Sequence, residues 1–87
     1  MIKLLSVRRA GDRSLDLIFS DGSSARWSAQ ELIERDTVLT RPLADPSYLA
    51  RAFIEAGSLA WPNGLELSGH SLHRRLSEAG ALKRQAA

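Results

Sequence analysis

The sequence predicts a small α+β domain, built from one antiparallel sheet of about five strands and short helices that include a C-terminal one. Three observations lead to this fold class. Apolar and polar residues alternate before an Asp-Gly pair, and this pattern is typical of a strand that enters a hairpin. Serine and aspartate precede short apolar stretches, as they do at helix starts. The 87 residues allow one domain with a small core.

The N-terminal part is predicted to be a three-stranded meander. Leu15, Leu17 and Phe19 alternate with residues 16, 18 and 20 in the period-2 pattern of a half-buried strand, so one face of this strand should be buried. Asp21-Gly22 follows and predicts a type I′ turn, because both residue types tolerate positive φ. The expected strands are residues 2–9, 15–19 and 23–27.

Two short helices are expected next. Ser28 and Glu31 fit a capping box, in which the serine caps the helix and the glutamate reaches back. Asp45 before Pro46 predicts a second cap with proline in the first helical position.

A second hairpin and a last helix complete the predicted domain. Residues 51–56 and 59–61 read as strands around a Gly57-Ser58 turn, and the first could be a sheet edge open to homodimer formation. The last helix should begin after Ser68 or Ser71 and stop near Gly80. The domain is therefore expected over residues 1–80, with 81–87 as a frayed tail.

Composition narrows the possible functions. The chain has no cysteine, which excludes disulfides and thiolate chemistry, and its start lacks the pattern of a signal peptide, so we expect a cytoplasmic protein. The formal net charge of +2 is compatible with a nucleic-acid partner but does not require one. No phosphate-binding glycine loop, nucleophile elbow or carboxylate pair is recognisable, so we expect neither an enzyme nor a cofactor.

Three stretches together resemble one bacterial family, the domain of unknown function numbered twenty-four forty-two. Order and spacing match over roughly residues 2–72, and the most distinctive stretch is the last. The family often has aspartate where this chain has Glu66. The stretches are Leu17-Ile18-Phe19-Ser20-Asp21-Gly22, Pro42-Leu43-Ala44-Asp45-Pro46-Ser47-Tyr48 and Trp61-Pro62-Asn63-Gly64-Leu65-Glu66-Leu67-Ser68.

The resemblance implies a small α+β domain without an established activity. Some members of that family are fused to a helix-turn-helix DNA-binding domain. Others look like partners of a second small protein, in arrangements similar to toxin–antitoxin pairs.

The Trp61-Pro62-Asn63-Gly64 run has two interpretations. A tryptophan is a common anchor at binding surfaces, so Trp61, Asn63 and the nearby Glu66 could belong to a recognition surface. The favoured interpretation is a structural corner, with Trp61 covering the core and Gly64 at positive φ.

The last helix carries the remaining candidates. His70 and His73 lie three residues apart and could in principle share a metal, but a third ligand is missing, so we expect solvated histidines and no metal. Arg74, Arg75, Lys83 and Arg84 make the C-terminal end the most basic part of the chain. They could contact phosphates, or simply form a solvated helix face.

Two functional hypotheses follow. The favoured one is a non-catalytic protein-interaction module, an antitoxin-like partner of a second small protein. Its binding surface would consist of Trp61, Asn63, Glu66, His70, His73, Arg74 and Arg75. The alternative is a nucleic-acid-binding accessory protein, whose contacts would be Arg74, Arg75, Lys83 and Arg84. No membrane partner is expected, because no apolar run is long enough to span a bilayer.

Overall fold

The computed structural model describes residues 1–84, which fold as the expected α+β domain around two antiparallel sheets. The meander is present as predicted, with β2 in the middle. The elements in chain order are β1 (Leu4–Arg9), β2 (Ser14–Phe19), β3 (Ser23–Ser28), α1 (Gln30–Arg35), the 3-10 helix η1 (Arg41–Ala44), α2 (Pro46–Leu49), β4 (Phe53–Glu55), β5 (Ser58–Ala60), β6 (Glu66–Leu67), α3 (Gly69–Glu78) and β7 (Lys83–Arg84).

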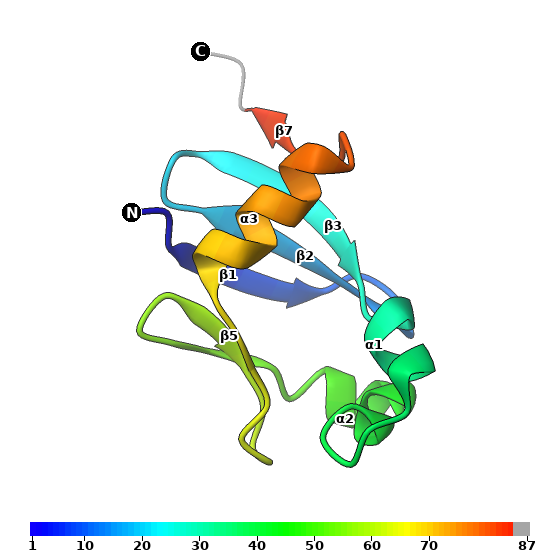
Figure 1. Cartoon of the computed structure of the whole chain (residues 1–87). Coiled ribbons are helices and arrows are strands. Elements are labelled where there is room, and N and C mark those ends of the chain that lie inside the picture. The colour runs from blue at the N-terminus through cyan, green and yellow to red at the C-terminus, as the bar shows by residue number, and fades with distance from the viewer. Residues whose placement is uncertain (85–87) are drawn as a thin grey trace.

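The strands do not form the single sheet of the sequence prediction. The larger sheet, here sheet A, has the order β1-β2-β3-β7, and the smaller, sheet B, has the order β4-β5-β6. Helix α3 lies across one face of sheet A, with the β4–β5 hairpin beside its N-terminal end (Figure 1). As predicted, β4 is an edge strand of sheet B; self-association through it stays a prediction.

The tail prediction is wrong for residues 81–84. The Ala81 N–H donates to the Leu76 carbonyl at 2.9 Å, and Lys83 and Arg84 then pair with β3 as strand β7. This pairing satisfies backbone groups at the edge of the meander, which a local reading of the sequence could not foresee. The rest of the predicted tail, residues 85–87, lies outside the described residues.

Two predicted local details are also wrong. The Asp21-Gly22 connection is not a type I′ turn, because Gly22 has a positive φ of 85° but Asp21 does not. The Asp21 carboxylate instead accepts bonds from the Ser23 N–H and hydroxyl, which fixes a three-residue loop. A two-residue turn with positive φ at both positions occurs in the other hairpin, at Ala56 and Gly57, one residue before the predicted site.

Helix starts follow the predicted chemistry in two of three cases. The side chains of Asp45 and Ser68 accept N–H bonds from the first turns of α2 and α3. The capping box at Ser28 does not form, because Ser28 belongs to β3 and Ala29 occupies the N-cap of α1. The Ser28 hydroxyl still accepts a hydrogen bond from the Gln30 N–H at 3.1 Å.

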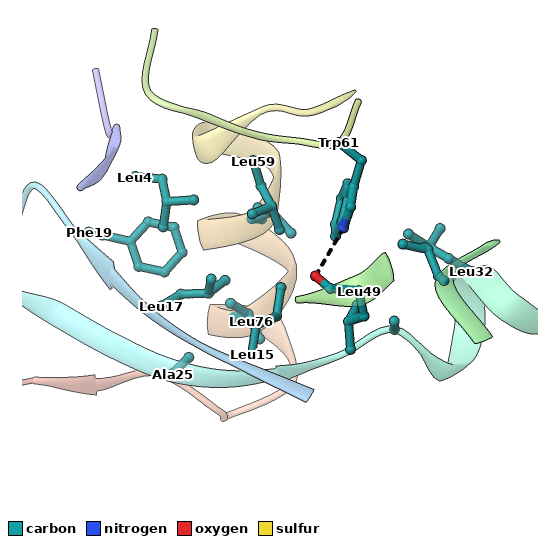
Figure 2. Packing of buried hydrophobic residues seen from close by; sticks show 13 residues of the cluster. Leu4, Leu15, Leu17, Phe19, Ala25, Leu32, Leu49, Leu59, Trp61 and Leu76 are labelled. Atoms are coloured by element: carbon teal, nitrogen blue, oxygen red, sulfur yellow. Dashed lines mark hydrogen bonds between the residues drawn. The ribbon is translucent and has the colours of Figure 1, made fainter. Parts of the chain in front are cut away.

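A single hydrophobic cluster joins both sheets and the helices. Leu15, Leu17 and Phe19 point from β2 towards α3, whose Leu72 and Leu76 are also buried, as Figure 2 illustrates for Leu76. The predicted inward face of β2 is therefore confirmed. No helix among residues 1–84 is long and apolar enough to cross a membrane.

The edge strand β1 contains a bulge. Leu4 pairs with Phe19 and Ser6 pairs with Ile18, so Leu5 is an extra residue without a partner on β2. Such an insertion bends an edge strand and interrupts its ladder. Near the bulge, the Leu4 N–H donates to the Gly57 carbonyl at 2.8 Å and links sheet A to the β4–β5 hairpin.

Candidate functional site

A groove of about 460 Å³ lies between α1 and α3. Its floor is apolar and its rim is charged. The floor includes Trp27, Leu32, Leu67, Leu72 and Leu76, and the charged rim residues are Glu31, Arg35, Glu66 and Arg75. A hollow of this size, with a few charged groups around apolar side chains, matches the usual character of a binding site.

The amphipathic sequence of α3 builds one wall of this groove. Leu72 and Leu76, four residues apart, are buried against the core. Ser71, Arg75 and Ala79 are spaced in the same way along the neighbouring stripe, and all three line the groove. The helix therefore buries one stripe, which also contributes to the groove floor, and presents the adjacent stripe as the groove wall.

Helix α1 supplies the opposite wall. Glu31 and Arg35 lie one turn apart and form an ion pair at 3.2 Å between the carboxylate and the guanidinium. Glu66 and Arg75, on β6 and α3, take part in no ion pair among residues 1–84. The rim thus presents one carboxylate and one guanidinium that are available to a ligand.

The Trp61 corner is structural, and its assignment to a recognition surface is wrong. Trp61 is only 1% exposed, and its Nε1–H donates to the Leu49 carbonyl at 3.2 Å (Figure 2). Gly64 has the predicted positive φ, 94°. An aromatic ring enclosed in this way cannot contact a partner in this conformation.

Asn63 is exposed, but its polar atoms hold the same corner. Its Nδ2 donates to the Leu39 carbonyl at 3.0 Å and its Oδ1 accepts the Leu65 N–H at 3.1 Å. Its backbone N–H donates to the Tyr48 hydroxyl at 3.2 Å. These bonds tie the corner to the loop at Leu39 and to helix α2, and of Trp61, Asn63 and Glu66 only Glu66 lines the groove.

The two histidines have different surroundings. His70 is exposed as expected, whereas the expectation of a solvated His73 is wrong. The His73 side chain is 16% exposed; its Nε2 lies 2.9 Å from Asp21 Oδ2 and its ring meets Phe19 edge-to-face at 5.2 Å. No group of three side chains that could hold a metal occurs within residues 1–84.

Asp21 is the electrostatic centre of this contact. The bonds from the Ser23 hydroxyl and N–H, followed by the bond to His73, hold the pKa of the Asp21 carboxyl well below its usual range. The contact fastens α3 to the β2–β3 loop over a sequence separation of 52 residues. His73 therefore orients the helix that carries Arg75.

The basic C-terminal cluster does not exist as one surface. Arg75 lines the groove, whereas Arg74 is exposed on α3 outside it. Lys83 lines a hollow on the opposite face of sheet A, and strand alternation directs Arg84 to the other side of β7 from Lys83. These four cations are therefore divided among different parts of the surface.

Of the predicted partner-binding residues, the groove contains Glu66 and Arg75. It also contains Trp27, Glu31 and Arg35, which were not predicted as site residues. The four-residue spacing of Glu31 and Arg35 indicates that they share one face of a helix. Nothing local indicated that this face would stand opposite α3.

No protein-family model, curated protein or solved structure matches this chain. The resemblance to the family numbered twenty-four forty-two therefore stays a prediction, and the candidate site rests on its own geometry.

Proposed function

We propose that this protein is a non-catalytic interaction module that binds a helical segment of a second small protein in the groove between α1 and α3. The observation that carries the proposal is the apolar floor of this groove within a rim of charged side chains. We place the module in the cytoplasm, as the cysteine-free sequence led us to expect.

The floor favours an apolar ligand. Trp27 is half-buried, so part of its ring remains available beside Leu67 and Leu72. An amphipathic helix that lays its apolar stripe into a groove is a recurring form of protein recognition, and tryptophan is a frequent anchor in such surfaces. A partner helix with apolar residues at positions i, i+3 or i+4, and i+7 would suit this floor.

The rim favours a ligand that carries both signs of charge. Glu66 and Arg75 have no ion-pair partners among residues 1–84, and they come from two different elements of the groove wall. A cation and an anion beside the apolar stripe of the partner would complement them. Such pairs select a partner and accelerate its association more than they add affinity. An antitoxin-like role is one form that this proposal can take.

The test compares two neighbouring arginines. Tagged wild-type protein, Arg75→Glu and Arg74→Glu should be used to capture partners from source cells, with mass spectrometry of the proteins retained at moderate salt. A single small protein at near-equal stoichiometry should be retained by wild type and by Arg74→Glu, and Arg75→Glu should weaken its binding by roughly tenfold or more. Both arginines are exposed on α3, but only Arg75 lines the groove.

A steric pair gives a second, independent readout. Ala79→Arg should obstruct the groove, whereas Ser77→Arg, on an exposed position of the same helix outside the groove, should not. Equal binding by wild type, Arg75→Glu and Ala79→Arg would show that the groove is not the partner site.

A further inference from the structure

The face of sheet A opposite α3 carries two ordered rows of side chains. The pairing register places Arg8, Asp16 and Arg26 side by side across β1, β2 and β3. One step along the strands, a second row crosses all four strands and consists of Ser6, Ile18, Ser24 and Lys83. Both rows line a shallow hollow of about 490 Å³, and Ile18 at its centre is 44% exposed.

This face is positively charged. It holds three cations, Arg8, Arg26 and Lys83, against one carboxylate, Asp16. Arg26 is occupied with Asp16, because its Nε and Nη2 donate to the two carboxylate oxygens at 2.9 and 3.3 Å. Arg8 and Lys83 take part in no ion pair among residues 1–84.

The pKa of the Asp16 carboxyl is consistent with this excess of positive charge. The bond from Arg26, with the added charges of Arg8 and Lys83, lowers the pKa of the Asp16 carboxyl below its ordinary value. All three cations therefore act on Asp16. They also leave an excess of positive charge for a ligand that covers it.

We propose that the open face of sheet A binds the phosphate backbone of a nucleic acid, with Arg8 and Lys83 as its principal contacts. Guanidinium, ammonium and serine hydroxyl groups are the donors that proteins direct at phosphates, and Ser6 and Ser24 lie beside these two cations. The site goes beyond the proposed function and lies on another part of the fold from its groove.

The composition of the two rows favours contact with the phosphate backbone of the nucleic acid and not recognition of its bases. No aromatic ring lies in either row, so this face lacks the platforms on which bases usually stack. A protein ligand is usually held by large buried anchors, and Ile18 is the only large apolar side chain in the two rows. Binding should therefore be independent of base sequence and sensitive to salt.

The test measures the anisotropy of a fluorophore-labelled, mixed-sequence single-stranded DNA over a salt series. Two phosphate contacts give an expected log–log salt slope of about −1.4 for wild type, since a single strand contributes about −0.7 per contact. Arg8→Ala/Lys83→Ala should bind roughly tenfold more weakly at low salt, with a slope near zero. Far-UV circular dichroism should be unchanged, because both side chains are exposed.

Two further variants make the test specific. Arg74→Ala/Arg84→Ala also removes two exposed cations but leaves both rows intact, so it should bind like wild type. Asp16→Asn releases Arg26 and should bind more tightly, with a slope steeper by about 0.7.

Three outcomes would overturn the proposal. The first is equal weakening by the two double variants, which would indicate unspecific attraction by net charge. The second is polyglutamate binding as tightly as the oligonucleotide, which would indicate an acidic protein segment as the ligand. The third is absence of wild-type binding at low salt.

Discussion

Trp61 illustrates how one side chain can be compatible with two roles. A large ring with one N–H group serves equally well in a core or at an interface. The structure places the ring inside, with its N–H satisfied by the Leu49 carbonyl twelve residues earlier. The neighbours of Trp61 in sequence predicted the corner. They carried no information about Leu49, which decides the orientation of the ring.

Asp21 leads to a prediction about pH. Its pKa is lowered in the folded protein by Ser23 and His73, while the unfolded value is about 3.9. A depressed carboxyl pKa contributes stability that is complete above the unfolded value and is lost as the pH falls towards the folded one. Asp21→Asn should therefore lower the free energy of unfolding at neutral pH, and its difference from wild type should shrink below about pH 4.

Urea unfolding followed by circular dichroism over the acidic range would measure this difference. Asp12→Asn is a suitable control, because Asp12 lies in an exposed ion pair with Arg9 and should contribute little. A difference between Asp21→Asn and wild type that stayed constant with pH would show that the charge of Asp21 is not what stabilises the contact.

At the scale of elements, Gly69 sets how closely α3 approaches the sheets. It is buried at the start of the helix, beside the Gly57 carbonyl and the Leu4 backbone. A Cβ at this position would lie 2.8 Å from the Leu4 nitrogen, a distance too short for any side chain. Because these neighbours are backbone atoms, they cannot move aside without shifting β1 or the β4–β5 hairpin.

Gly69→Ala should consequently destabilise the protein by about 1–3 kcal/mol, as overpacking does. This is the opposite of the usual gain of up to about 1 kcal/mol when alanine replaces glycine in a helix. Chemical denaturation gives the free energy of unfolding directly. Ser77→Ala, exposed on the same helix, should remain within about 0.5 kcal/mol of wild type. A stabilised Gly69→Ala would disprove this close packing.

The elements that the sequence predicted correctly are those defined by local chemistry. The inward face of β2, the caps at Asp45 and Ser68 and the positive φ of Gly64 each depend on a few neighbouring residues. Strand β7 was missed because two residues become a strand only by pairing with β3, about sixty residues earlier. The separation into two sheets was missed because it depends on which strands meet, and the hydrophobic pattern does not encode that.

The same distinction applies to the candidate site. Arg75 could be named from the sequence because it lies in a helix with a clear amphipathic pattern. Glu66 could be named because it follows the recognisable corner at Trp61. Trp27 and Arg35 could not, because they join the site through the packing of α1 opposite α3. The rows on the open face of sheet A likewise required the register of three strand pairs, which no single segment reveals.

For the whole molecule, the two proposed surfaces lie on different sides of sheet A. The groove is on the side that carries α3, the helix that Figure 1 shows across sheet A. The strand register places the rows of cations on the reverse. Neither set of lining residues contains a member of the other. The two proposed ligands would therefore not compete for the same residues.

This arrangement predicts independent binding. With a partner identified, its addition should change the dissociation constant of the labelled oligonucleotide by less than about twofold, since coupling requires a shared or bistable element. Arg75→Glu should lose the partner and keep the oligonucleotide, and Arg8→Ala/Lys83→Ala should do the reverse. Anisotropy titrations in the presence and absence of the partner would measure this, and displacement of one ligand by the other would contradict it.

The bulge in β1 has a consequence for how the length of this chain can vary. Deleting a residue from a strand normally turns every following side chain to the opposite face. Leu5 is the exception, because Leu4 and Ser6 already occupy consecutive positions opposite Phe19 and Ile18. Without Leu5, inward Leu4, outward Ser6 and inward Val7 would simply alternate. Position 5 is therefore a place where the strand can be shortened by one residue while both faces of sheet A keep their side chains.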